Sequence, residues 1–494
     1  MIFALALVVL GALVGLLTVA LSVAVGGGAS LFAERPQLVW LLPVAGLCSY
    51  GAYRAVGLDF SWSTARVMEA VRDGRSVPPL LAPAIIVGTA LTVLCGGSVG
   101  KEAAALQMGA AASGLLRGRV SARFRTVLAP AAMGAALGAM LDAPLAGVVF
   151  SFEALRRRPD SFASLAAPAV TSLVSWGVVR AMGVRFLPGS VAAPAVLDVV
   201  FAGDSFMGDR IAGALLLLAA VGAAAGLLTL AFCGALEKLR GGLARLGAPV
   251  FALAVGGVAT ALVVGYADLF HYEDVRSYCG TGLSQIEAAL AGEALPWWAF
   301  IVKAALTLLT LAGGFKGGEI MPVLATGACL GAAVFSAASP LLPASILGAV
   351  GASRSLGALV GMVAFFAACT NCPLTALAFA GELFGFACCN SSRLSDRPPG
   401  QSLSNLLAAR ARQMPVRPRF GVSRCQLRGA LAGNASSTPL WHAPDYQSGV
   451  ELAFARAKAK MRAWSFGLPA SRARAFPIAR PRPPGREGSR LLRG

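Results

Sequence analysis

A lysine and a glutamate stand side by side in an apolar stretch of the chain, GGSVGKEAAALQMG, which runs from Gly96 to Gly109. Charged side chains inside apolar segments are costly, and those that persist mark functional sites. An alternative is that Lys101 and Glu102 form a buried ion pair with each other. Adjacent residues of a helix point in different directions, however, which disfavours this pairing. Glu102 is therefore the first candidate functional residue.

A second glycine-rich stretch, GGFKGGEIMPVLATGA, begins at Gly313 and repeats the spacing of the first. Gly100 corresponds to Gly317, and Glu102 corresponds to Glu319. A proline and a glutamate nine residues apart follow each stretch, in DAPLAGVVFSFEAL and in NCPLTALAFAGELF. Two motifs that recur in the same order predict two related halves, an arrangement typical of transporters and channels.

The glycines and the helix-favouring residues after them suggest what these stretches bind. Glycine lets the backbone approach a ligand closely, and the start of a helix has free N–H groups and the positive end of the helix dipole. Together they form an anion site that needs no full positive charge and allows fast release. A carboxylate such as that of Glu102 would compete with the anion, so that its protonation would free the site. Glu102 is thus predicted to be a gate or a proton carrier.

The composition places these motifs in a membrane protein. The 494 residues are 57% hydrophobic and 13% charged, whereas soluble proteins have about 25% charged residues. Apolar runs of spanning length predict an all-α polytopic membrane protein, because helices satisfy their own backbone hydrogen bonds in lipid. The predicted segments lie near 1–27, 80–96, 126–152, 161–183, 209–233, 247–268, 297–312, 321–338 and 356–388, with shorter candidates at 37–50 and 103–116.

Three regions follow from the repeat and the composition: a first membrane half at 1–190, a second at 191–387 and a basic, Pro- and Arg-rich tail at 388–494. The tail has 19 Lys and Arg residues and 4 Asp and Glu residues. It could bind anionic lipid or nucleic acid, but its composition favours disorder without such a role. We expect no nucleic-acid partner. The abrupt change of composition also suggests a shifted reading frame in the source gene.

The sequence offers little for catalysis or metal binding. It has two histidines, no H-E-x-x-H motif, and no G-x-S-x-G motif in the context of a hydrolase. Cys369 and Cys372 form a C-x-x-C, but no second pair completes a metal site. We therefore predict no enzymatic activity, no cofactor and no metal.

Taken together, these motifs resemble the CLC family of chloride channels and proton-coupled anion antiporters. Gly100-Lys101-Glu102 matches the family's first signature, and GGEIMP, Gly317 to Pro322, resembles its second. The resemblance implies two inverted-repeat halves whose interrupted helices meet at an anion site near the membrane midplane. It also implies a homodimer with one pore per subunit. The high content of Ala, Gly, Arg and Pro suggests a bacterial source, and on that basis we expect a multi-pass protein of the plasma (cell) membrane.

The resemblance also implies site residues. Glu102 would be the gating glutamate, and the family's first anion motif is replaced here by DFSWSTARV. Ser61 or Ser63 would supply the missing hydroxyl, unless these serines only cap a helix or stabilise a loop. The anion-binding residues implied are Gly100, Lys101, Ala103, Glu319, Ile320, Met321, Ser61 and Ser63.

Three departures from the family pattern bear on mechanism. Ala154 stands where many antiporters have an internal proton-carrying glutamate, and no tyrosine of the tail matches the family's central tyrosine. Glu319 replaces an apolar residue, as in the bacterial branch that includes fluoride/proton antiporters, or it is a neutral group that only shapes the pore. We expect transport of a small inorganic anion through a lipid bilayer, as a voltage- or proton-gated chloride conductance gated by Glu102. The alternative is a fluoride/proton antiporter that uses Glu102 and Glu319.

Overall fold

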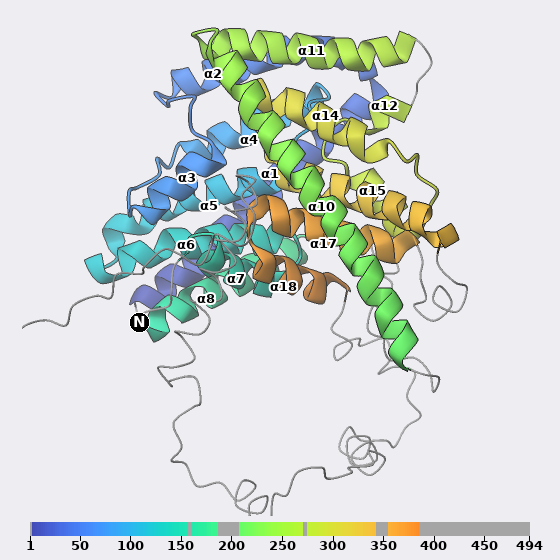
Figure 1. Ribbon diagram of the computed structural model, residues 1–494. Coiled ribbons are helices and arrows are strands. Elements are labelled where there is room, and N and C mark those ends of the chain that lie inside the picture. The colour runs from blue at the N-terminus through green and yellow to red at the C-terminus, as the bar shows by residue number, and fades with distance from the viewer. Residues whose placement is uncertain (1, 157–160, 186–206, 270–273, 342–353, 385–494) are drawn as a thin grey trace, which may run out of the picture. The chain divides into compact units, whose positions relative to one another are not determined.

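The computed structural model describes residues 2–156, 161–185, 207–269, 274–341 and 354–384, which form helices joined by loops (Figure 1). All of them belong to one unit, Met1–Arg397. The second unit, Pro398–Gly494, and the predicted tail at 388–494 lie outside the described residues. The elements of the first half are α1 (Ile2–Glu34), η1 (Pro36–Leu41), α2 (Leu42–Ala55), α3 (Thr64–Arg72), α4 (Leu81–Leu94), α5 (Glu102–Leu116), η2 (Arg117–Arg119), α6 (Ala122–Met140), α7 (Pro144–Glu153) and α8 (Phe162–Ala181). Those of the second half are α10 (Met207–Ala244), α11 (Pro249–Leu269), α12 (Asp274–Ser277), α13 (Leu283–Ala291), α14 (Ala299–Ala312), α15 (Ile320–Ala338), η3 (Ser339–Leu341), α17 (Arg354–Thr370) and α18 (Pro373–Phe384).

The helices fit a polytopic membrane protein. Among the described residues, five helices are long and apolar enough to cross a membrane by length and composition. Several shorter helices are also apolar, including α4, α7, α14 and α18. The prediction of an all-α polytopic chain is confirmed. The five long segments are Phe3–Glu34, Phe162–Ala181, Leu218–Ala244, Pro249–Ala267 and Ile320–Ala338.

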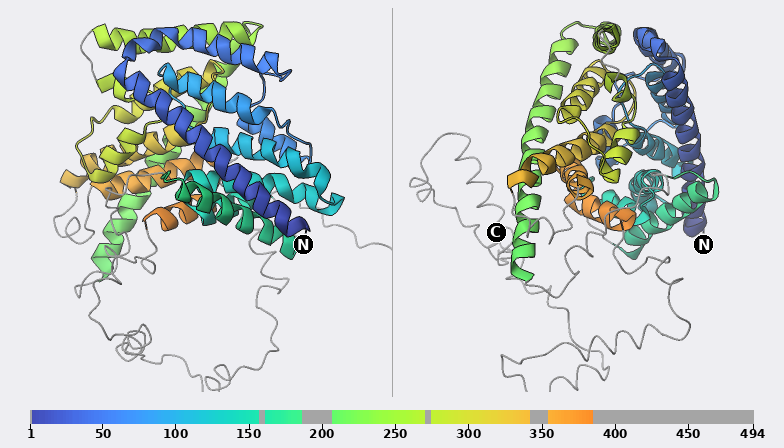
Figure 2. Two further views of the ribbon diagram at one scale, coloured as in Figure 1. Left: turned by 180° about the vertical axis from the view of Figure 1, so that it is seen from behind. Right: turned by 90° about the vertical axis from the view of Figure 1, so that its right-hand side faces the viewer.

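The second half repeats the helix order of the first. The series α3, α4, α5, α6 and α7 corresponds to α13, α14, α15, α17 and α18, and each series follows a long helix, α1 or α10. Within these series, α3 and α13 have 9 residues each, and α4 and α14 have 14 each. Figure 2 shows α1 and α10 on opposite sides of the shorter helices. The interrupted helices of an inverted repeat are therefore present in both halves.

Two apolar runs that the sequence presents as single segments are each divided into two helices. The run at 126–152 contains α6 and α7, and the run at 356–388 contains α17 and α18. Asp142 and Asn371 have positive φ angles of 57° and 55° at the two breaks. Each is followed two residues later by the proline that begins the next helix. Left-handed backbone and a missing N–H group both end a helix, which explains the breaks.

Small residues let the helices of each half pack closely. Gly331 of α15 faces Gly357 of α17 so closely that an added methyl group would collide with the facing backbone. Gly134 of α6 and Gly147 of α7 make the same kind of contact in the first half. Without a hydrophobic drive between helices in lipid, such close backbone packing is the main source of their association.

Candidate functional site

The two glycine-rich stretches of the sequence meet in the fold. Gly100 and Gly318 form an isolated antiparallel β-bridge, with N–H to carbonyl distances of 2.6 Å and 2.8 Å. A β-carbon on Gly100 would lie 2.7 Å from the Met321 Cβ, and one on Gly318 would lie 2.6 Å from the Ala103 Cβ. Only glycine allows this approach. The antiparallel bridge brings the starts of α5 and α15, which begin at Glu102 and at the residue after Glu319, to one place.

The carboxylate of Glu102 lies over this bridge. The residue is 0% exposed, and neither of its carboxylate oxygens has a hydrogen-bond partner among the described residues. Its Oε2 is 2.6 Å from the position that a β-carbon on Gly100 would occupy. The backbone N–H groups of Lys101, Glu102 and Met321 face the carboxylate without reaching hydrogen-bond geometry. The carboxyl group of Glu102 thus occupies the place at which two helix starts meet.

The alternative ion pair between Lys101 and Glu102 is not formed. The Lys101 Nζ lies 3.5 Å from the Ser22 Oγ, at hydrogen-bond distance. The salt bridges found in the described part of the chain involve Arg66, Arg75 and Arg180, not Lys101. The alternative in which Glu102 serves only as the ion-pair partner of Lys101 is therefore excluded by the geometry.

One cavity, of about 450 Å³, is lined by Lys101 and Met321, which lie next to the bridge. Its wall also includes Arg276 and the loop before α13. The two basic side chains give the cavity a positive wall, which would attract anions.

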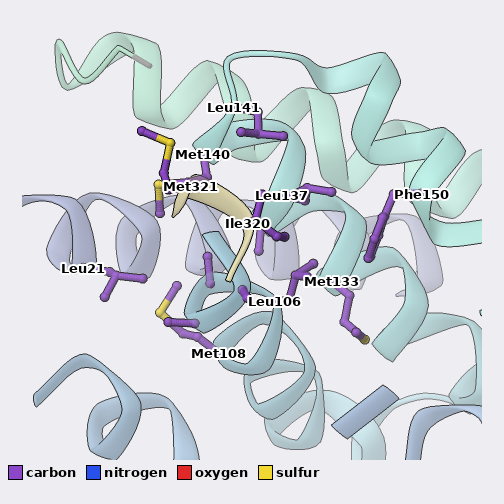
Figure 3. Packing of buried hydrophobic residues seen from close by; sticks show 14 of the residues in the cluster. Leu21, Leu106, Met108, Met133, Leu137, Met140, Leu141, Phe150, Ile320 and Met321 are labelled. Carbon is purple, nitrogen blue, oxygen red and sulfur yellow. The ribbon is translucent and has the colours of Figure 1, made fainter. Parts of the chain in front are cut away.

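A second cavity, of about 510 Å³, lies on another side of the bridge and is lined by three of the remaining candidate residues. Gly317 and Glu319 line it together with Ser61 and Ser63. Ile320 and the residues of the bridge itself line neither cavity. Figure 3 shows Ile320 and Met321 among packed apolar side chains. The candidates Gly100 and Ala103 are buried between the two helix starts.

The two serines have different partners. The Ser61 hydroxyl donates to Asp59 Oδ2 at 2.6 Å, and the Ser61 N–H donates to Asp59 Oδ1 at 2.9 Å. These bonds, with Arg66 nearby, hold the pKa of the Asp59 carboxyl below its usual value. The Ser63 Oγ caps α3 by accepting from the Arg66 N–H at 3.3 Å. Ser61 thus stabilises a loop, and Ser63 caps a helix. A hydroxyl that accepts a hydrogen bond as a cap still has its own proton to donate. Ser63 also lines the cavity.

Glu319 lies directly before α15, in the wall of the 510 Å³ cavity. It is half-buried, and its carboxylate makes no hydrogen bond or ion pair with any residue that the structure describes. Arg240 of α10 lines the same cavity. The alternative of a hydrogen-bonded Glu319 that only shapes the pore has no partner to support it in this part of the chain.

Gln107 is a lining residue that the sequence reasoning missed. It is 2% exposed, and its Nε2 donates to the Thr64 Oγ1 at 3.0 Å in the wall of the 510 Å³ cavity. Its Oε1 has no partner among the described residues. The signal in the sequence was a single amide side chain within the alanine run of α5.

Two departures from the family pattern have different outcomes. Ala154 is buried directly after α7, so it supplies no proton-carrying group there. A tyrosine of the tail would fall beyond residue 384, outside the described residues. Among the described residues, no group of three or more metal-binding side chains is found.

The family of the chain follows from comparisons with known proteins. The family model described as "Voltage gated chloride channel" matches residues 41–389. A "Chloride/fluoride channel protein" of Pseudomonas syringae pv. tomato is 33% identical over 365 residues, which are 71% of this chain and 73% of that protein.

Two solved structures share the fold. A CLC-type fluoride/proton antiporter has a TM-score of 0.65 and 24% identity, and the match covers 78% of this chain and 91% of that one. A slow cyanobacterial Cl⁻/H⁺ antiporter has a TM-score of 0.63 and 19% identity, with 84% and 99% covered. The family match over most of the membrane region, the inverted repeat and the paired glycine signatures lead to one conclusion: the chain belongs to the voltage-gated chloride channel (CLC) family of anion transport proteins.

Proposed function

We propose that the chain conducts chloride and related small halides across the membrane through a pore that Glu102 gates. The observation that supports this most strongly is the buried Glu102 carboxylate, which lacks a partner and lies over the Gly100–Gly318 bridge. A buried charge without a partner is unfavourable, so the carboxylate is expected to leave when an anion replaces it or when a proton neutralises it. The cavities on two sides of the bridge would be the approaches to this gate.

Within this proposal, Ser63 supplies the hydroxyl that replaces the family's first anion motif. The Ser61 proton is committed to Asp59, whereas Ser63 accepts from the backbone and retains its proton for an anion. The backbone of Gly100, Lys101 and Ala103 and that of the second helix start would line the path. A homodimer is the assembly expected from the family resemblance, and the plasma membrane is its expected location.

Efflux from liposomes tests this function. Purified parent protein and Glu102→Gln are reconstituted, and chloride and fluoride efflux are measured with ion-selective electrodes from pH 5 to pH 8. We expect parent efflux to rise as the pH falls, because a protonated carboxyl no longer competes with the anion. Glu102→Gln should conduct at every pH with little pH dependence. Parent efflux that is absent, or a variant that retains the parent's pH dependence, would refute the gate.

Glu319 favours a second candidate, the exchange of fluoride for protons. Its half-buried carboxylate lies in the cavity wall without a described partner, at the other helix start from Glu102. Two carboxylates at the two helix starts would provide two stations for a proton that moves opposite to the anion. The relative named a chloride/fluoride channel protein supports both anions as substrates. Proton movement measured beside anion efflux distinguishes the two candidates.

A further inference from the structure

Lys316, directly before Gly317 in the second glycine-rich stretch, is a buried cation with no role in the family signature described above. The residue is 7% exposed, and its stem packs against Gly88 of α4. Its Nζ donates to the Phe60 carbonyl at 2.6 Å and to the Trp62 carbonyl at 2.9 Å. A residue of the second half thus holds a loop of the first half, more than 250 positions earlier in the chain.

Aromatic rings complete the surroundings of this ammonium group. Its Nζ lies 3.9 Å from the centre of the Phe60 ring and 4.6 Å from that of the Tyr53 ring. The negative faces of such rings stabilise a cation. Among the described residues, Lys316 forms no ion pair with a carboxylate. The nearby Asp59 carboxylate instead binds Ser61 and Arg66. Its charge is therefore not cancelled by a direct ion pair.

The loop that Lys316 holds carries the serines of the cavity. The two carbonyls are those of the residues on either side of Ser61, and Ser63 follows directly. Lys316, Ser61 and Ser63 all line the 510 Å³ cavity. A shift of the held carbonyls would move the Ser63 hydroxyl with them.

We propose that Lys316 is a positioning residue for anion preference: it fixes the Ser63 hydroxyl at the cavity wall. The proposal depends on the anion conduction proposed above. A small anion with a high charge density gains most from a hydroxyl that is held in place, because its hydration shell is the most costly to replace. Loss of Lys316 should therefore lower fluoride efflux more than chloride efflux.

The experiment measures the ratio of fluoride to chloride efflux in liposomes for the parent, Lys316→Met, Ser63→Ala and the double variant. We expect Lys316→Met to lower the ratio by about tenfold, the size expected from weakening one hydrogen bond to a charged partner. Because Lys316 acts through Ser63, the double variant should show little further change beyond the larger single effect. A parental ratio in folded Lys316→Met, or additive effects in the double variant, would overturn the proposal.

Lys303 provides a matched control for the loss of a buried lysine. It is 0% exposed, and its Nζ donates to the Tyr278 and Gly280 carbonyls at 2.9 Å and 2.8 Å, and to Ser98. It thus holds the loop before α13 and Ser98 of the first glycine-rich stretch, but not the loop that carries Ser61 and Ser63. Lys303→Met should lower the amount of folded protein without the change of ratio that Lys316→Met produces. An equal change of ratio in both variants would show a general structural effect and overturn the proposal.

Two conservative variants of Lys316 cover a failure of Lys316→Met to fold. Lys316→Arg retains the charge and at least two donors, so its ratio should remain near that of the parent. Lys316→Gln retains a donor but not the charge, so its ratio should lie between those of the parent and Ser63→Ala. A parental ratio in folded Lys316→Gln would contradict the proposal. Parent protein that carries neither anion would instead refute the proposed function.

Discussion

Glu153 caps the start of α18, and Glu382 caps the start of α7, so each glutamate stabilises the helix that carries the other. The Glu153 carboxylate accepts from the Leu374 N–H at 2.9 Å, the Thr375 N–H at 2.7 Å and the Thr375 hydroxyl at 2.7 Å. The Glu382 carboxylate accepts from the N–H groups at the start of α7, both at 2.8 Å. Carboxylates at helix starts satisfy free donors and complement the helix dipole. This exchange joins the two halves through equivalent residues, as an inverted repeat requires.

Glu153→Gln should destabilise the fold. The amide retains one acceptor but places an NH₂ group against the donors of α18, so we expect a loss of about 2 kcal/mol of unfolding free energy. Denaturant unfolding in detergent, followed by tryptophan fluorescence, measures the loss. Glu69→Gln makes the same change at an exposed residue and should change stability by less than about 0.5 kcal/mol. Equal stability of Glu153→Gln and the parent would contradict the capping role.

Gly318→Ala should disrupt the bridge between the two glycine-rich stretches. The added methyl group would lie 2.6 Å from the Ala103 Cβ and 2.8 Å from the Ala103 N, so the start of α5 must move. We expect anion efflux to fall by at least about tenfold, since small shifts of a site have effects of this size or larger. Gly241→Ala is the control, because its added methyl group meets no atom within 4 Å and lies within helix α10. Gly241→Ala should have parental efflux and unchanged or higher stability. Parental efflux in Gly318→Ala would contradict the prediction.

Local patterns in the sequence were sufficient to predict the fold class, whereas the meeting of the two glycine-rich stretches was implied by the family resemblance. Apolar runs of spanning length indicate helices in lipid, and the repeated spacing around Glu102 and Glu319 indicates equivalent positions. The breaks at Asp142 and Asn371 were harder to predict, because one polar residue hardly lowers the mean hydropathy of a long apolar run. The polar residue and the proline two residues later mark each break.

The partners of the site residues could not be read from the sequence. Ser61 and Ser63 are two residues apart, and only the fold shows that one binds Asp59 and the other caps α3. The contact between Lys316 and the loop that carries Ser61 and Ser63 joins residues far apart in the chain, so no local sequence pattern predicts it. The spacing of nine residues from proline to glutamate revealed the repeat, but not that Glu153 would cap a helix of the other half.

Gln107→Met should lower anion efflux with little net change in stability. The Gln107 Oε1 is buried without a partner among the described residues, so its removal should gain about 1 kcal/mol of unfolding free energy, and the loss of the Nε2 hydrogen bond to Thr64 should cost about the same amount. The same change removes the only polar part of this side chain from the wall of the cavity that it shares with Thr64. Denaturant unfolding and liposome efflux, measured on the same preparation, check both effects. Lower stability with parental efflux would mean that the amide has a purely structural role.

Glu319→Gln tests whether protons move with the anion. If the chain is an antiporter, the parent should take up or release protons as fluoride moves, and Glu319→Gln should lose this proton movement while it still passes the anion. The reason is that an amide occupies the same volume in the cavity wall but cannot carry a proton. A pH electrode in weakly buffered solution outside the liposomes records protons, and a fluoride electrode records the anion. Glu237→Gln changes an exposed residue of α10 and is the control for the loss of one negative charge.

If the parent moves no protons, a chloride conductance gated by Glu102 explains the transport better than an antiporter does. A Glu319→Gln variant with the parent's ratio of protons to anions would exclude Glu319 as the proton carrier, because the amide that replaces the carboxyl group cannot carry a proton.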